Sequence, residues 1–279
     1  MLQIIVFSIL VGVAITQAGK AGQGILSVFQ DFNDVIMRMV TILMHLAPYG
    51  VFCLLAKLFT EEGFSAILNL ALYFMTVTLV LLVHASMVYT SIFSLFTRLN
   101  PMTLIKNLRP AMLFAFSTSS SNATMPVTMN VMEKRVGVDN SVASFTVPLG
   151  ATINMDGTAI MQGVATVFIA QVYGIDLSSS QLLMVVLTAT LASIGTAAVP
   201  SAGLIMLSLV LTQAGLPVEG IALILGVDRL LDMVRTAVNV TGDATVSTVV
   251  AYHEGQLDEV VFNDPDADIE GDNETQRAA

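Results

Sequence analysis

The sequence predicts an all-α membrane protein that combines spanning helices with two opposed re-entrant helical hairpins. The first observation is composition: 55% of the 279 residues are hydrophobic and 11% are charged, whereas soluble domains average roughly 45–50% apolar and about 25% charged residues. The second is that Asp, Glu, Lys and Arg are absent from three long stretches, 63–97, 110–132 and 177–218, and a spanning helix needs about 20 such residues. The third is that clusters of small residues interrupt two apolar segments.

Lysine and arginine predict how the chain is oriented in the membrane. They concentrate in three connections, at 17–38, 98–109 and 133–140. The positive-inside rule places such connections in the cytoplasm. Few Lys or Arg residues surround three other connections, near Glu61, Asp176 and Glu219. We therefore expect these three connections on the opposite side.

Two apolar segments, 103–131 and 181–214, then have both ends on one side of the membrane. Each contains a tip of Ser, Thr, Gly and Ala near a proline: "FSTSSSNATMPVTM" with Pro126 and "ASIGTAAVPSAGLIM" with Pro200. Each flank has about 13–15 residues, too short to span at 1.5 Å per residue. Small residues also allow close helix packing, but two interrupted segments in corresponding positions are typical of inverted-repeat transporters. Both segments are therefore predicted to be re-entrant hairpins.

Three regions follow from this pattern. Residues 1–100 are expected to form a partial scaffold with spanning helices, and residues 101–252 a transport core. The core consists of a hairpin, a spanning helix, a second hairpin and a second spanning helix, at 103–131, 141–173, 181–214 and 219–252. Residues 253–279 carry nine acidic residues and one arginine, and such a sequence is expected to be a disordered, cytoplasmic tail.

Ionisable residues interrupt the last spanning helix, in the stretch "DRLLDMVRTAVNVTGD" at 228–243. At 3.6 residues per turn, six polar side chains fall within an arc of about 100°: Asp228, Asp232, Arg235, Thr236, Asn239 and Asp243. Such a stripe must face the bundle interior or a cavity. One interpretation is purely structural, with Asp232 paired to Arg235 and Asp228 to Arg229. That interpretation leaves Asp243 without a cation, so we expect a metal ion or a proton there.

The first spanning helix carries one acid, Asp156, in "GATINMDGTAIMQG". Gly150, Gly157 and Asn154 around it favour local unwinding, which turns carbonyl oxygens inward. Carbonyl and carboxylate oxygens bind hard cations, and transporters hold sodium with unwound carbonyls. The alternative is a neutral, hydrogen-bonded core acid.

These residues together favour a cation-coupled carrier for a small solute bearing both charges. Arg235 would take an anionic group and Asp232 an ammonium, while Asp156 and Asp243 would hold cations. The three histidines are scattered in the sequence, so a zinc or haem site is not expected. The serine-rich tip lacks a nearby basic residue for nucleophilic catalysis, and no phosphate-binding loop occurs. The chain is therefore not expected to be an enzyme.

Four stretches carry a family resemblance: "TSSSNATMPVT", "NMDGTA", "SIGTAAVPSAG" and "DMVRTAVNVTGD". In this order and spacing they resemble the signatures of the glutamate transporter family, the dicarboxylate/amino acid:cation symporters, over residues 1–252. The resemblance implies sodium-coupled symport of glutamate or aspartate by elevator-like alternating access. It also implies a multi-pass protein of the plasma or inner cell membrane that forms a homotrimer. Sodium is the coupling ion, no other cofactor is implied, and no nucleic-acid partner is expected.

The resemblance also implies roles for individual residues. The tip at Ser120 and Ser121 would offer backbone groups to a substrate carboxylate, Asp232 would bind the amino group, and Arg235 the side-chain carboxylate. The full set of implied substrate contacts is Ser120, Ser121, Thr158, Val199, Gly203, Asp232, Arg235, Thr236 and Asn239. The implied sodium ligands, by side chain or carbonyl, are Gly150, Thr152, Asn154, Asp156, Ser193, Ile194, Thr196, Asn239 and Asp243.

Family members have eight spanning helices, whereas this chain is expected to begin within the fourth. The missing third helix would complete one sodium site near Asp156, so the chain as given is expected to insert but to transport poorly. Four alternatives stay open: a C4-dicarboxylate carrier, a neutral amino-acid carrier, an anion channel and a non-transporting remnant. Asp232 argues against a dicarboxylate without an amine, and Arg235 argues against a neutral substrate.

Overall fold

The computed structural model describes residues 2–44, 49, 52, 53, 56, 60 and 65–264, and every regular element in them is helical. This confirms the predicted all-α class. The chain divides into two compact units, residues 1–63 and 64–279. The first unit contains α1 (Leu2–Ala18), the 3-10 turn η1 (Gly19–Ala21) and α2 (Gln23–Met44).

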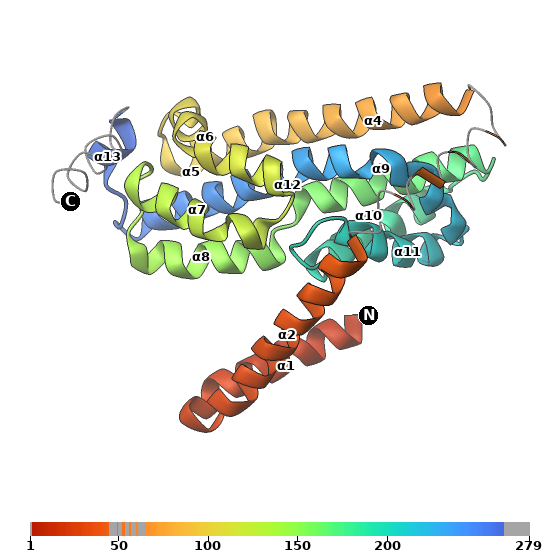
Figure 1. Cartoon of the computed structure of the whole chain (residues 1–279). Coiled ribbons are helices and arrows are strands. Elements are labelled where there is room, and N and C mark those ends of the chain that lie inside the picture. The colour runs from red at the N-terminus through yellow and green to blue at the C-terminus, as the bar shows by residue number, and fades with distance from the viewer. Residues whose placement is uncertain are drawn as a thin grey trace. The chain divides into compact units, whose positions relative to one another are not determined.

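The second unit contains all the residues of the predicted substrate and sodium sites. Its elements are α4 (Ser65–Val83), the π-helical turn η2 (His84–Tyr89), α5 (Thr90–Thr97), α6 (Pro101–Thr118), α7 (Ser121–Lys134), α8 (Asn140–Ile153), α9 (Asp156–Val172), α10 (Ser179–Ile194), α11 (Ala202–Ala214), the 3-10 turn η3 (Val218–Gly220), α12 (Ile221–His253) and α13 (Glu259–Asn263). Helix α12 is central, because α4, α6, α7, α8 and α9 all pack against it (Figure 1).

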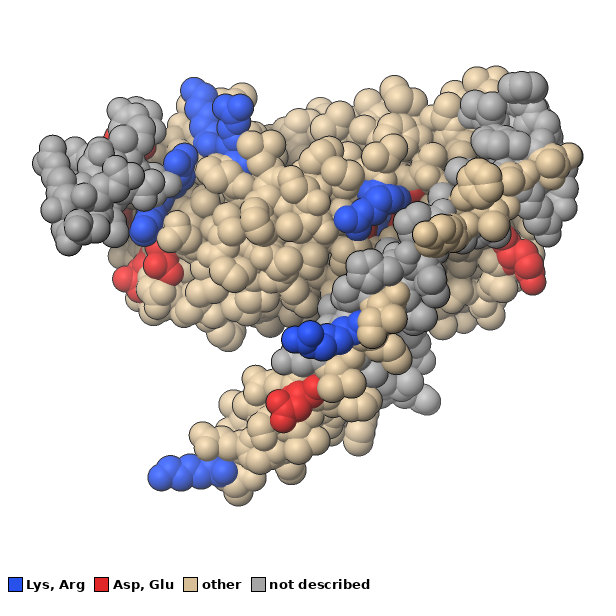
Figure 2. Space-filling model, in the orientation of Figure 1, with Lys and Arg blue, Asp and Glu red and all other residues tan. Residues whose placement is uncertain are grey.

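One described helical segment, Leu68–Thr97, is both long and apolar enough to cross a membrane by composition, with a mean hydropathy of 2.0. It runs without interruption through α4, η2 and α5. Leu72, Met75 and Leu79 expose their side chains along it, as lipid-facing residues of a spanning helix do. Figure 2 shows that charged side chains gather at the end of the second unit near α13, while uncharged side chains cover most of the rest of this face.

Each predicted hairpin is a pair of packed helices joined at the expected tip. Helix α6 ends at Thr118, and the following residue, Ser119, adopts a left-handed conformation with φ of 52°. The Ser120 side chain caps α7 by accepting the Ala123 N–H. In the second hairpin, residues 195–201 separate α10 from α11. The two tips touch, because the Ser120 hydroxyl donates to the Ala198 carbonyl at 2.9 Å.

The predicted helix 141–173 is interrupted where the sequence suggests unwinding. Helix α8 ends at Ile153, and α9 begins at Asp156. Asn154 and Met155 between them have non-helical backbone angles. The interruption leaves backbone groups at two helix ends without intrahelical partners, and it places them beside α12.

Residues 254–264 are folded, which differs from the disorder predicted for the acidic tail. Leu257 forms a β-bridge with Val138, and the Asp258 N–H donates to the Gly137 carbonyl at 2.8 Å. Gly137 has φ of 78°, and a Cβ there would lie 2.4 Å from the Asp258 carbonyl oxygen. A glycine is therefore needed at this crossing. The rest of the predicted tail, 265–279, lies outside the described residues.

A short helix then anchors this segment to the core. Asp258 caps α13 by accepting the N–H groups of Val260 and Val261. Phe262 is completely buried and stacks on Phe93, with ring centroids 6.1 Å apart. The disorder prediction was wrong for residues 254–264 because it averaged the charge of the whole tail, whereas one buried aromatic residue and one helix cap fix this part.

The Asn107 side chain makes a testable contribution to this anchoring. Its Nδ2 donates to the carbonyls of Arg135 and Phe262, at 2.8 and 2.9 Å. We expect Asn107→Ala to lower the free energy of unfolding by about 1–3 kcal/mol, since carbonyls in a buried setting lose their donor. Thermal unfolding in detergent measures this, with Asn130→Ala, an exposed residue of α7, as the control. Equal effects of the two substitutions would contradict the anchoring role.

Candidate functional site

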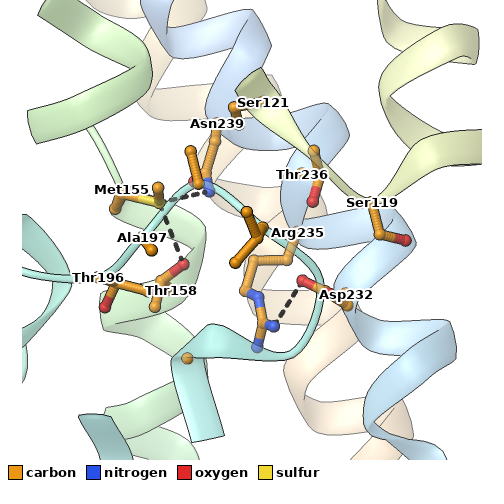
Figure 3. Close-up of a pocket in the computed structure, with 13 residues that line it drawn as sticks. Ser119, Ser121, Met155, Thr158, Thr196, Ala197, Asp232, Arg235, Thr236 and Asn239 are labelled. Atoms are coloured by element: carbon orange, nitrogen blue, oxygen red, sulfur yellow. Dashed lines mark hydrogen bonds and ion pairs between the residues drawn. The ribbon is translucent and has the colours of Figure 1, made fainter. Parts of the chain in front are cut away.

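A small cavity lies where four parts of the second unit meet (Figure 3). Its walls come from α12, from the α8–α9 interruption and from the tips of both hairpins. The lining residues are Ser119, Ser121, Met155, Thr158, Thr196, Ala197, Ala198, Val199, Gly203, Asp232, Arg235, Thr236 and Asn239. The cavity volume is about 10 Å³, roughly the space for one water molecule. The hairpin tips therefore close tightly over the polar face of α12.

An ion pair between Arg235 and Asp232 forms one wall of the cavity. Arg235 Nη2 donates to Asp232 Oδ1 at 2.6 Å, and Arg235 is only 1% exposed. A longer contact of 3.5 Å joins Arg235 Nη1 to Asp228 Oδ1. The Asp232–Arg235 pair of the structural interpretation is therefore present. The other proposed pair is wrong, because Asp228 faces Arg235 while the Arg229 side chain is exposed.

Asp232 also links α12 to the second hairpin. Its Oδ2 accepts the Ser201 N–H at 2.7 Å. Ser201 lies directly before α11 in a left-handed conformation with φ of 60°. Since both carboxylate oxygens of Asp232 are hydrogen-bonded, a ligand that binds Asp232 must share these oxygens with Arg235 and Ser201 or displace them.

The first hairpin contributes its serine-rich tip. Ser120 is buried and does not line the cavity, because its hydroxyl donates to Ala198 of the second hairpin. The Asn122 N–H donates to the same carbonyl at 3.4 Å. Ser119 does line the cavity, and its buried hydroxyl has no hydrogen-bond partner in the described part of the chain. An unpaired buried hydroxyl is available to a bound polar ligand.

The start of α9 packs directly on the polar face of α12. The Gly157 N–H, one of the free donors of the first helical turn, donates to Asn239 Oδ1 at 2.8 Å. Asn239 Nδ2 in turn donates to Met155 Sδ at 3.6 Å. A Cβ on Gly157 would lie 2.9 Å from Arg235 Cγ and 3.0 Å from Asn239 Oδ1. Residue 157 must therefore be glycine for Arg235 and Asn239 to keep their positions.

Two glycines of α9 provide a matched test of this packing. We expect Gly157→Ala to lower the thermal unfolding midpoint, because overpacking a core costs about 1–3 kcal/mol. Gly163→Ala should leave the midpoint unchanged or raise it, since nothing lies within 4 Å of a Cβ there and alanine favours helix by roughly 1 kcal/mol. Equal midpoints for the two variants would contradict the close approach of α9 to Arg235.

A second polar cluster lies beside the cavity and consists of His84, Tyr89, Asn154, Asp156 and Asp243. Asn154 Nδ2 donates to Asp243 Oδ1 at 2.9 Å. The Tyr89 hydroxyl donates to Asp156 Oδ2 at 3.0 Å, and His84 Nε2 lies 3.2 Å from the same oxygen. His84 and Tyr89 are the first and last residues of the π-helical turn η2, and π-bulges occur frequently at functional sites.

Two glycines allow this cluster to form. A Cβ on Gly150 would lie 2.6 Å from Asp243 Oδ1. A Cβ on Gly242 would lie 2.5 Å from the Tyr89 hydroxyl oxygen and 2.6 Å from Asn154 Nδ2. The end of α8, η2 and α12 therefore meet closely around Asp243. A side chain in place of Gly150 or Gly242 would push them apart.

The charges of the cluster suit a small hard cation. Asp243 is 3% exposed, and its hydrogen-bond partner is the neutral amide of Asn154. A buried carboxylate is costly without a compensating charge, and oxygen ligands of this kind hold hard cations. No group of three or more His, Cys, Asp or Glu residues that could hold a metal occurs within the described residues. The oxygen atoms of this cluster are of the type that binds hard cations such as sodium.

The structure brings most of the predicted substrate residues together. Eight of the nine line the cavity: Ser121, Thr158, Val199, Gly203, Asp232, Arg235, Thr236 and Asn239. The ninth, Ser120, lies behind the tip and fixes the contact between the hairpins. Their roles as ligands stay predictions.

The predicted sodium residues fall into two groups. Gly150, Asn154, Asp156 and Asp243 gather at the second polar cluster, while Thr196 and Asn239 line the cavity. The side chains of the remaining residues point elsewhere: the Thr152 hydroxyl donates to Pro148, the Ser193 hydroxyl donates to Thr190, and Ile194 is the last residue of α10. For these three, a role through the backbone carbonyl stays a prediction.

Sequence reasoning missed several neighbours of these groups. It treated Asp156 as a lone buried acid, whereas the side chain is 37% exposed and contacts His84 and Tyr89. His84 and Tyr89 precede Asp156 by 72 and 67 residues, so helix periodicity could not connect them to it. Their polar ring atoms within a mostly apolar helix were the one available sign. Met155 was missed because a thioether is a weak acceptor.

The chain is similar to known transporters over most of its length. The sequence profile of the sodium:dicarboxylate symporter family matches residues 1–253. An excitatory amino acid transporter of Caenorhabditis elegans is 44% identical over 259 residues, which cover 92% of this chain and 51% of that protein. Excitatory amino acid transporter 1 is 42% identical in Mus musculus and 39% in Homo sapiens, each over 253 residues, 90% of this chain and 47% of the relative. The chain thus spans about half the length of the curated relatives it matches.

Proposed function

Because the chain belongs to the sodium:dicarboxylate symporter family, we propose that it is the substrate-binding part of a sodium-coupled symporter for acidic amino acids. The observation that carries this proposal is the buried pair of Asp232 and Arg235, side by side on α12 beneath two hairpin tips (Figure 3). Asp232 can bind a cationic group and Arg235 an anionic group, so the pair matches a solute that carries both an ammonium and a second carboxylate.

Each charged group of such a substrate has a partner of matching chemistry. The Arg235 guanidinium binds the side-chain carboxylate, since its planar donors fit a carboxylate bidentately. Asp232 binds the ammonium. The other carboxylate reaches the tip of the first hairpin, where Ser119 has a free hydroxyl and Ser121 begins α7, whose N-terminal N–H groups favour anions. Thr158, Thr236 and Asn239 complete the polar wall.

Sodium ions are the coupling ions in this proposal. Asp243 and Asn154 form one ligand set with the carbonyl of Gly150, and Asp156 belongs to a neighbouring set. Ser193, Ile194 and Thr196 offer carbonyls at and just beyond the end of α10; the Ser193 carbonyl accepts the Thr196 N–H at 3.0 Å and keeps a second lone pair for a cation. Sodium on these oxygens compensates buried negative charge, so substrate and sodium stabilise the same closed arrangement.

The second hairpin acts as the gate. Three hydrogen bonds hold it closed: the Ala198 carbonyl accepts from Ser120 and Asn122, and the Ser201 N–H donates to Asp232. In this proposal Asp232 binds the substrate ammonium as well as the Ser201 N–H of the gate. Substrate binding and gate closure therefore involve the same carboxylate. Both hairpins are re-entrant in this proposal, and residues 101–252, together with the segment α4 to α5 that packs against α12, move as a transport core past a scaffold. The protein works as a homotrimer in the cell membrane with a cytoplasmic C-terminus.

Uptake into liposomes tests the proposal. The chain joined to the N-terminal half of a relative should accumulate radiolabelled aspartate when an inward sodium gradient is applied, and not when sodium is replaced by choline, while the 279 residues alone should transport poorly. Preferential uptake of succinate would indicate a dicarboxylate carrier, and preferential uptake of serine a neutral amino-acid carrier. A steady anion current without accumulation would indicate a channel. Sodium-independent accumulation of aspartate would contradict the coupling.

A further inference from the structure

Arg235 lies between two carboxylates that hold it unequally. Its contact with Asp232 is 2.6 Å long and its contact with Asp228 is 3.5 Å long. Asp228 is 2% exposed, and its second oxygen, Oδ2, has no hydrogen-bond partner among the described residues. A buried carboxylate oxygen without a partner is costly, so Asp228 retains unused capacity to accept a donor from Arg235.

The helix geometry directs Arg235 toward both acids. Side chains of an α-helix tilt toward its N-terminus, and Asp232 and Asp228 lie about one and two turns N-terminal to Arg235 on the same face. A guanidinium has five N–H donors in a fixed fork. Asp228 can therefore hold Nη1 while the other donors turn toward a ligand.

Substrate binding redistributes these contacts under the proposed function, on which this role rests. The substrate ammonium takes Asp232, and Arg235 then loses its shorter hydrogen bond. Without a second protein partner, the long arginine side chain would have to be ordered by the substrate alone, which weakens binding. Asp228 is the other carboxylate that the structure places within reach of the guanidinium.

We propose that Asp228 is a positioning residue that holds the Arg235 guanidinium in place when the substrate ammonium displaces it from Asp232. Asp228 acts on substrate affinity only through Arg235. It therefore strengthens selection of a second carboxylate, and it contributes little to recognition of a solute that lacks one.

A double-mutant cycle on binding tests this role. Asp228→Ala is expected to weaken aspartate binding about tenfold, the loss that follows removal of a hydrogen bond to a charged group. Asp228→Asn keeps an acceptor without the charge and should lie between Asp228→Ala and the parent. In the Arg235→Cys background, Asp228→Ala should change serine affinity by less than about twofold, since no guanidinium remains to position. Asp176→Asn, an exposed acid in the loop after α9, is the control and should match the parent.

A second cycle needs no substrate and separates this role from the proposed function. The thermal unfolding midpoints of the parent, both single variants and the double variant report whether Asp228 and Arg235 are coupled. We expect the unfolding midpoint of the double variant to fall by less than the sum of the two decreases in the single variants. Additive losses, or an equal loss of aspartate and serine affinity in Asp228→Ala, would overturn the positioning role. If the parent binds no acidic amino acid, the proposed function fails, and the unfolding cycle alone decides whether Asp228 holds Arg235.

Discussion

Arg235→Cys is expected to weaken binding of aspartate and glutamate by two to three orders of magnitude while sparing or revealing binding of serine and alanine. Arg235 is 1% exposed, so removing it leaves a substrate carboxylate buried without its partner. Broken buried charge pairs cost about 3–5 kcal/mol, which corresponds to roughly two to three decades in affinity. A neutral amino acid has no second carboxylate to leave unpaired.

Competition binding against radiolabelled aspartate measures this effect. Arg229→Cys is the matched control, because Arg229 lies on the same helix with an exposed side chain. The control should bind acidic and neutral amino acids as the parent does. Equal losses for acidic and neutral amino acids in Arg235→Cys would mean that Arg235 serves only to stabilise α12 through its ion pairs.

Asp243→Asn is expected to raise the sodium concentration for half-maximal aspartate binding by at least about tenfold. The carboxylate is 3% exposed, and a neutral amide is its hydrogen-bond partner. Removing its charge removes the main electrostatic attraction for a cation, and a buried charged interaction of this kind is worth more than about 1.4 kcal/mol, or one decade. Asparagine nearly preserves the shape, so folding and membrane insertion should change less.

Aspartate binding by the parent and by Asp243→Asn, measured over a series of sodium concentrations, tests this prediction. Asp176→Asn, which neutralises an exposed acid, controls for the loss of one negative charge. If Asp243→Asn keeps the sodium response of the parent, sodium does not bind at this carboxylate.

Several parts of this site could be predicted from local sequence patterns. Polar residues at helical spacing placed Asp232, Arg235 and Asn239 on one face, and all three line the cavity. Small residues near Pro126 and Pro200 predicted two tips, and the structure has helix breaks at both. The glycines around Asn154 predicted the interruption between α8 and α9. In each case the signal lies within a few residues of the feature, where backbone conformation and helix periodicity act directly.

Contacts between distant segments could not be predicted in this way. The π-helical turn that brings His84 and Tyr89 to Asp156 changes the phase of a helix that contains no Asp, Glu, Lys or Arg to mark one face. The fold of residues 254–264 depends on a β-bridge and on the burial of Phe262, and neither depends on the average charge of the tail.

The central claim is that the cavity binds an acidic amino acid while the neighbouring polar cluster binds sodium, and that the two bind together. Equilibrium binding of radiolabelled aspartate to the purified chain, at a series of sodium concentrations and with succinate and serine as competitors, tests it most directly. The account predicts that aspartate affinity rises steeply with sodium, and that succinate and serine compete weakly, because each lacks a group that Asp232 or Arg235 binds. Aspartate affinity that does not change with sodium, or succinate that competes as well as aspartate, would contradict it.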